Sequence, residues 1–169
     1  NNVRSRIILW DIAWKGFQQH WLLGVGPENY SFVVNTHFDP SLYAYQAAWN
    51  DKPHNIFLEL LVTQGVVGLS AYIAILVSAG YTLRKLYKNR RMSALQVAAL
   101  SGALAAYVAA NIFAFDTVSS LLSFATLLAL IVAHTPAPNI EDVVPSRKQF
   151  VAGMATAGVL TVGVLSLSV

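Results

Sequence analysis

The feature that most constrains this chain is a set of long apolar stretches without a single charged residue. There are four of them, at residues 66–83, 92–115, 117–132 and 149–169. A helix needs about 20 mainly apolar residues to cross the hydrocarbon core of a bilayer. Each stretch comes close to that length. We therefore expect an all-α integral membrane fold with about four transmembrane helices.

Composition and charge support this expectation. The chain is 56% hydrophobic and only 11% charged, whereas soluble domains have about 25% charged residues. The net charge of +3 comes mostly from one cluster, Arg84–Arg91. A short basic cluster between two apolar helices is typical of a cytoplasmic loop, so we expect no nucleic-acid partner. The chain has no cysteine, which excludes disulfides and thiolate chemistry.

The basic residues also predict an orientation, since Arg84–Arg91 and Arg147 should both lie on the cytoplasmic side. The amino-terminal region then lies outside the membrane, on the periplasmic or extracellular side. The expected organisation is a loop region with amphipathic helices that carry the site at 1–65, three transmembrane helices at 66–134, a cytoplasmic linker at 135–148, and a fourth transmembrane helix at 149–169.

A polar segment, Asp51–His54, runs directly into a long apolar run. Proline is favoured in the first turn of a helix, so Pro53 predicts a helix start, with Asp51 as its N-cap. His54 would then lie in the first helical turn. The positive end of the helix dipole disfavours a charged imidazole, so we expect His54 to be neutral and able to accept a proton.

Residues 5–21 are predicted to form an amphipathic helix with aromatic residues along one face. Arg6 falls on the aromatic face, one turn before Trp10, whereas Arg4 falls on the wet face. An arginine on the buried side of a helix needs an anion or an aromatic partner. Arg6 could therefore bind an anion, stack on Trp10, or extend to lipid headgroups.

The connecting segments give weaker signals. Residues 24–27 predict a tight turn, 28–35 a short helix, and 36–52 an irregular polar loop. Asp116 is expected to be either a helix cap at the membrane interface or part of a site. The histidines and aspartates of the amino-terminal region match no compact metal-ligand motif, so we expect no metal site and no cofactor.

Three segments together resemble the O-antigen ligase-like family of bacterial membrane proteins. They are Arg6–Trp10, Leu23–Tyr30, and His54–Leu61 with the glycines that follow it. Asn111–Asp116 is a weaker match, and the resemblance covers residues 4–134. The family includes O-antigen ligases, O-antigen polymerases and bacterial O-oligosaccharyltransferases. The resemblance implies that the helices are part of a larger GT-C-like helical bundle in the bacterial inner membrane, with the site facing the periplasm or the cell exterior.

The resemblance also implies a function. Such enzymes move a glycan from a polyprenyl-diphosphate carrier to an acceptor hydroxyl, on lipid A core, a polysaccharide or a protein, without a metal or nucleotide. By this resemblance Arg6 binds the diphosphate and His54 is the catalytic histidine, while Glu28 and Asn55 orient these groups. A single displacement should invert the anomeric centre.

Two further expectations follow. The chain begins without methionine, so we expect it to be the carboxy-terminal portion of a larger membrane protein, with additional spans and a further arginine upstream. The alternative function is a membrane transporter subunit without catalysis, because some relatives have been labelled bicarbonate transporters. A transporter should carry ionisable groups inside its spans, and these stretches have almost none.

Overall fold

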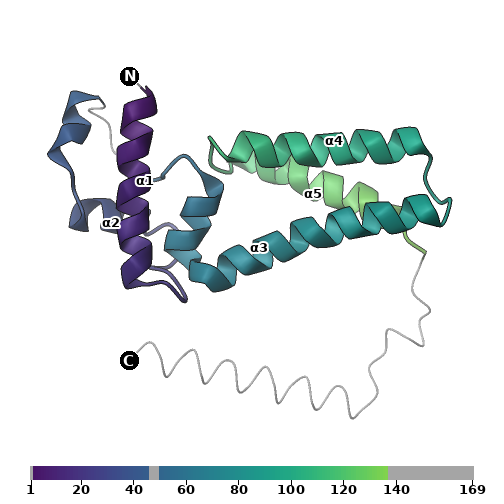
Figure 1. Ribbon diagram of the computed structural model, residues 1–169, viewed down its shortest axis with the longest axis horizontal. Coiled ribbons are helices and arrows are strands. Elements are labelled where there is room, and N and C mark those ends of the chain that lie inside the picture. Colours follow the sequence, from purple (N-terminus) through teal and green to yellow (C-terminus); the bar gives the residue numbers. More distant parts are fainter. Residues whose placement is uncertain (1, 46–49, 137–169) are drawn as a thin grey trace, which may run out of the picture. The chain divides into compact units, whose positions relative to one another are not determined.

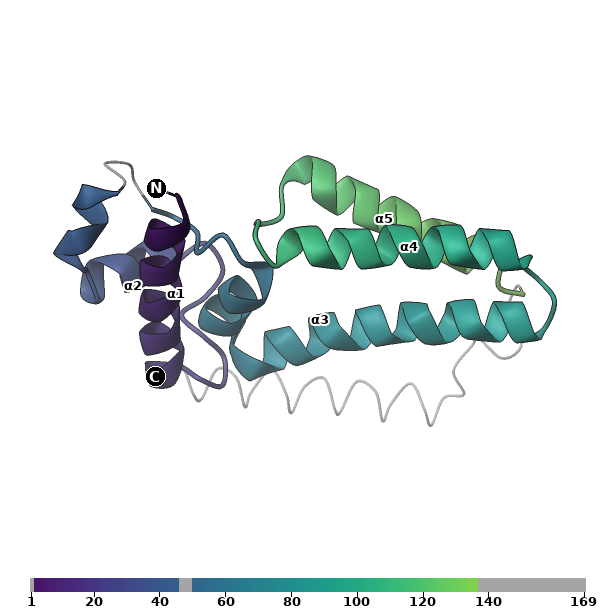
Figure 2. The same cartoon turned by 45° about the horizontal axis from the view of Figure 1, so that its top comes forward.

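A computed structural model describes residues 2–45 and 50–136 of the chain, and this part is entirely helical, with no strand. Figures 1 and 2 show its elements, which are α1 (Asn2–Gln19), α2 (Tyr30–Thr36), the 3₁₀ helix η1 (Pro40–Ala44), α3 (Ile56–Lys88), α4 (Ala94–Asn111) and α5 (Val118–Ala133). The predicted all-α class is confirmed for these residues. The expected helix at 149–169 and nearly all of the linker at 135–148 lie outside the described residues.

The amino-terminal helices share one hydrophobic core. It contains buried side chains from α1, α2, η1 and the first part of α3, namely Leu9, Ile12, Ala13, Tyr30, Val33, Val34, Leu42 and Val62. The Tyr30 hydroxyl donates a 2.6 Å hydrogen bond to the carbonyl of Leu9, which ties α2 to α1. The buried face of α1 is therefore the Leu9 face. The predicted aromatic face is largely at the surface, with Trp14 47% and Trp21, just past the helix, 56% exposed.

A second core lies between α3, α4 and α5, which run beside one another in both views (Figures 1 and 2). Its buried members are Ala79, Leu83, Leu86, Met92, Leu104, Phe124 and Ile131. Inside it, the rings of Tyr107 and Phe124 stack with centroids 4.6 Å apart. On α4 the packing uses Val97, Leu100, Leu104 and Tyr107, while most of its small side chains are exposed.

Gly65 breaks α3 into two segments, and the ribbon changes direction along this helix (Figure 2). Its φ of 65° and ψ of −167° lie outside the helical region, in a conformation that glycine adopts without a steric penalty. The first of the four apolar stretches, at residues 66–83, begins directly after the break.

The turn after α1 supplies the hydrogen bonds that the break removes. The amides of Val66 and Val67 donate to the carbonyls of Trp21 and Leu22, at 2.9 and 3.4 Å. On the other side of the break, the amide of Val25 donates to Val62, and that of the next residue to Thr63. A bend in a helix leaves backbone groups that must find other partners, and here the turn provides them.

Two helix starts differ from those predicted. Asn55, not Asp51, is the N-cap of α3, because its side chain accepts from the amides of Phe57 and Leu58. His54 therefore lies before the helix and not in its first turn. Thr117, not Asp116, is the N-cap of α5, and it forms a capping box with Ser120. In both cases the residue that caps the helix directly precedes its first helical residue, whereas the predicted cap lies further upstream.

Two described helices, α3 and α4, are long and apolar enough to cross a membrane, and α5 is a shorter apolar helix. Only 17% and 11% of their most apolar windows are buried in the described structure. The core helix of a soluble protein would be mostly buried, so these surfaces are suited to lipid or to other membrane helices. The described residues thus give two candidate spans, and the count of four is not confirmed.

Candidate functional site

A long-range hydrogen bond attaches the segment before α3 to α1. The indole Nε1 of Trp10 donates to the carbonyl of Pro53 at 2.9 Å. Arg6 precedes Trp10 by four residues, so it projects from the same face of α1. The contact brings this face of α1 up to the segment that carries His54.

His54 has an unusual backbone and a partly enclosed ring. Its φ is 55°, in the left-handed region that few residues other than glycine adopt. The imidazole is half-buried, and its ring centroid lies 5.2 Å from that of Phe115. A strained backbone at a titratable residue is typical of a functional site.

Two effects lower the pKa of His54 below its ordinary value. The larger is burial, which disfavours the charged imidazole, and the second is the positive charge of Arg6. The carboxylate of Asp51 opposes them more weakly. His54 is therefore neutral at neutral pH, as expected, but burial and Arg6 cause this, not a position inside the helix. The effect of Arg6 on this pKa agrees with the Trp10–Pro53 contact, which brings the Arg6 face of α1 up to the segment that carries His54.

The guanidinium of Arg6 has no anionic partner among the described residues. Among the described residues it forms no ion pair, no hydrogen bond and no stacking contact with Trp10. By contrast, Arg4 on the wet face donates to the Tyr45 hydroxyl at 3.3 Å and lies over its ring. The stacking alternative for Arg6 is thus not observed, and its half-buried charge can take an anion.

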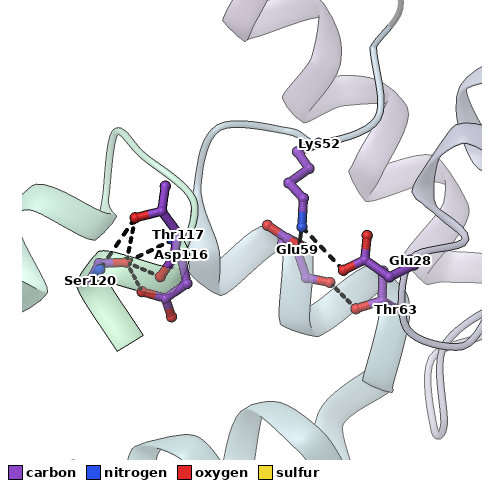
Figure 3. A network of polar contacts seen from close by, with 7 residues as sticks. All are labelled: Glu28, Lys52, Glu59, Thr63, Asp116, Thr117 and Ser120. Carbon is purple, nitrogen blue, oxygen red and sulfur yellow. Dashed lines mark hydrogen bonds and ion pairs between the residues drawn. The ribbon is translucent and has the colours of Figure 1, made fainter. Parts of the chain in front are cut away.

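Lys52 joins two carboxylates beside this pair (Figure 3). Its Nζ lies 2.9 Å from Glu59 Oε1 and 3.3 Å from Glu28 Oε1. Burial by itself lowers the pKa of Lys52, but the contacts with the two carboxylates outweigh it, so the pKa is raised. Lys52 is therefore charged, and the side chains of Lys52 and Glu59 are only 18% and 14% exposed.

Phe115 connects the histidine to the lysine. Its ring contacts the imidazole of His54, and the Nζ of Lys52 lies 5.7 Å from its centroid on the face of the ring. Phe113, two residues earlier, lies 6.4 Å from the indole of Trp10. The loop between α4 and α5 therefore contacts both α1 and the segment that carries His54.

Asp116 holds this loop in place (Figure 3). Its carboxylate accepts hydrogen bonds from the Tyr107 hydroxyl at 2.9 and 3.0 Å, from Ser120 Oγ at 3.0 Å, and from Asn111 Nδ2 at 3.4 Å. Donors from α4 and α5 thus converge on one carboxylate. Asp116 is part of the structure that supports the site and does not cap the helix.

The remaining predicted site residues lie close by, in supporting positions. Glu28 has a φ of 62° and pairs with Lys52. Asn55 caps α3, and so fixes where the helix begins directly after His54. The expected short helix at 28–35 is α2, which begins two residues later, and η1 lies within the loop expected to be irregular.

Sequence reasoning did not single out Lys52 or Phe115. One signal was present for Lys52, because Glu59 follows it by seven residues, which is two helical turns. Phe115 gave none, because an aromatic residue at the end of an apolar stretch is typical of a membrane interface. Among the described residues, no group of three or more metal-ligating side chains is found.

Comparison with known proteins gives one match. Residues 1–73, less than half of the 169, match the family model for O-antigen ligase. Arg6 and His54 both lie inside the match, and the loop with Phe115 and Asp116 lies beyond it. No curated protein and no solved structure matches the chain. Residues 1–73 are thus similar to O-antigen ligases, and the apolar helices α3 and α4 are long enough to cross a membrane. The resemblance seen in the sequence is thereby confirmed for residues 1–73, the part of the chain that matches the O-antigen ligase family.

Proposed function

We propose that this chain carries the catalytic region of a membrane glycosyltransferase of the O-antigen ligase or polymerase type. It transfers a glycan from a polyprenyl-diphosphate carrier to an acceptor hydroxyl on the outer side of the bacterial inner membrane. The observation that carries the proposal is the Trp10–Pro53 hydrogen bond, which brings the face of α1 with Arg6 up to the segment that carries His54. A cation for the leaving group and a base for the nucleophile are the two groups this reaction requires.

Arg6 binds the diphosphate. A guanidinium stays charged at any physiological pH and presents a planar set of donors that fits phosphate oxygens. When the bond between the anomeric carbon and the diphosphate oxygen breaks, negative charge grows on that oxygen. A cation already in place stabilises this charge without having to reorganise.

His54 takes the proton. The acceptor hydroxyl attacks the anomeric carbon, a new carbon–oxygen bond forms, and the hydroxyl proton passes to the neutral imidazole. Because the attack and the departure occur in one displacement, the anomeric configuration inverts. Phe115 contacts the imidazole, the Asn55 cap fixes where α3 begins directly after it, and neither a metal nor a nucleotide takes part.

The alternative, a transporter subunit, is less well supported. A pathway through the helices would need ionisable side chains along it. Residues 66–83 of α3 carry no charged residue, and neither do α4 and α5. Ion flux that does not depend on a lipid-linked glycan would favour the transporter.

The test is glycan transfer in cells that carry the full-length protein with single substitutions. We expect His54→Ala and Arg6→Ala each to reduce transfer by at least about 100-fold, the usual contribution of a positioned base or of a charge-stabilising group. Two matched controls are available. Arg4→Ala removes an arginine two residues away, and His20→Ala removes an exposed histidine. Both should transfer as the wild type does. Full activity in His54→Ala or Arg6→Ala, at equal protein level, would refute the proposal.

A further inference from the structure

The carboxy-terminal end of α3 is the end farthest from the site. It carries a dense positive charge without acidic partners among the described residues. Five basic residues lie within eight positions, at Arg84, Lys85, Lys88, Arg90 and Arg91. No acidic residue occurs anywhere between Glu59 and Asp116. In the described part of the chain, every ion pair is made by Lys15 or Lys52. These five charges are therefore balanced by nothing in the described structure.

The charges line two hollows that share Lys88. One, of about 690 Å³, lies at the turn from α3 into α4 and includes Arg90 and Arg91. The other, of about 350 Å³, lies along the last turns of α3 and includes Arg84 and Lys85. Cations near a helix C-terminus interact favourably with its dipole, which explains Lys85 and Lys88. It does not explain the arginines that follow the helix.

Arg90 gives a second, independent indication. Its φ is 54°, and the amide of Arg91 donates to the carbonyl of Leu86 at 3.0 Å. This is the Schellman arrangement, in which the left-handed residue after the helix is usually glycine. An arginine there strains the backbone where glycine would not. The chain therefore carries a cation at a position where glycine would be less strained.

Apolar and aromatic side chains next to the hollows indicate a membrane surface. Tyr81 and Tyr87, which line them, are 67% and 52% exposed, and Leu95, in the first turn of α4, is 80% exposed. Tyrosine is enriched at the level of lipid headgroups. A ligand here would have a phosphate for the cations and acyl chains for the apolar surface.

We propose that these two hollows form a binding site for the phosphate headgroups of anionic phospholipids, centred on Lys88. The site lies at the opposite end of the membrane helices from His54, and its occupancy does not depend on glycan transfer. Anionic lipids attract basic segments next to the membrane, and each Lys or Arg increases the affinity about fivefold. Binding also provides a counter-charge that the described residues do not supply.

The experiment uses the full-length protein in a neutral detergent, with thermal stability followed as lipid is added. Phosphatidylglycerol should raise the melting temperature in a saturable way, and phosphatidylcholine should not. Lys88→Gln should weaken the phosphatidylglycerol response about fivefold, measured as the concentration at half-maximal shift. Lys15→Gln, which removes a cation from α1, is the matched control and should respond as the wild type does.

Arg90→Gly separates binding from structure. Glycine suits the left-handed conformation, so this variant should be at least as stable as the wild type without lipid, yet should need about fivefold more phosphatidylglycerol. Three results would overturn the proposal. They are an equal response to both lipids, an unchanged response in Lys88→Gln and Arg90→Gly, and a full response to inorganic phosphate alone, which would indicate a small-anion site.

Discussion

Three factors set the pKa of His54, namely burial, the charge of Arg6 and the charge of Asp51, and each can be changed separately. Burial and Arg6 lower its pKa, and Asp51 raises it. Because the neutral form accepts the proton, transfer should be constant around pH 7 and should fall only as the pH drops below the ordinary value of 6.5. The fall in transfer at acid pH therefore reports the pKa of His54, and so the surroundings of its ring.

Asp51→Asn tests this account. Removing the carboxylate leaves burial and Arg6 unopposed, so the pKa of His54 falls further and the acid limb of the rate profile moves to lower pH. Asp11→Asn, a matched change at an exposed aspartate on α1, should leave the limb in place. The measurement is kcat/KM against pH for the full-length enzyme. A limb that moves upward in Asp51→Asn would contradict the assignment of His54 as the base.

Lys52 makes a stability prediction. In Lys52→Gln, the largely buried carboxylate of Glu59 loses its cation, and an unsatisfied buried polar group costs about 1–3 kcal/mol. Lys15→Gln breaks a pair that is more than half exposed, where such pairs contribute about 0.3–0.5 kcal/mol. Melting temperatures of the two variants give the comparison. Equal losses would mean that the Lys52 cluster is no more important than a surface pair.

The candidate residues Arg6 and His54 could be named from the sequence with the help of the family resemblance, but the geometry around them could not be predicted. Arg6 stands out as a cation on the aromatic face of its helix, and His54 stands out at the junction of a polar and an apolar segment. The left-handed conformation of His54 was not predictable, since Asp51 and Asn55 are equally good N-caps and only packing decides between them. Lys52 was overlooked because its partners, Glu28 and Glu59, come together only after α1 and α3 have packed.

At the scale of elements, the break at Gly65 positions the site relative to the membrane helices. It lets the first turns of α3 pack with α1 while the rest joins α4 and α5. A Cβ at Gly65 would collide with the backbone of Leu22, and φ at Gly65 is positive. The same turn has a second such position at Gly24, whose Cβ would meet the backbone of Thr63.

Gly65→Ala should therefore destabilise the protein by more than about 1 kcal/mol and should reduce transfer, because the turn would move away from the break. Gly102 provides the control. It lies within α4, and a Cβ there would meet nothing within 4 Å. Gly102→Ala should be neutral or stabilising by up to about 1 kcal/mol. Thermal unfolding of both variants in detergent is the measurement, and a Gly65→Ala protein as stable as Gly102→Ala would refute this role.

The elements themselves were largely predictable. Apolar length and the absence of charge locate α4 and α5 to within a few residues, whereas α3 begins ten residues before the charge-free stretch at 66–83 and ends five residues after it. The 3₁₀ helix at Pro40–Ala44 was not predicted, since it depends on the Asp39 side chain accepting from the Ser41 amide and on Leu42 entering the core. Short elements of this kind are determined by tertiary contacts and not by periodicity.

At the scale of the whole molecule, the account requires that His54 and the basic cluster lie on opposite sides of a membrane. The described chain has no cysteine, so single cysteines can be introduced at exposed positions. In spheroplasts, a membrane-impermeant maleimide should label Gln18→Cys directly and Asn89→Cys only after permeabilisation. Labelling of both from the same side would mean that α3 does not cross.

The central claim is that one cation and one base act on the same lipid diphosphate. Binding of a labelled polyprenyl-diphosphate glycan to the full-length protein, measured beside its rate of transfer, tests it most directly. We predict that Arg6→Ala loses donor binding, whereas His54→Ala keeps donor binding within about twofold of the wild type and loses at least about 100-fold in kcat. If Arg6→Ala bound the donor as the wild type does and His54→Ala transferred at the normal rate, the account would be wrong.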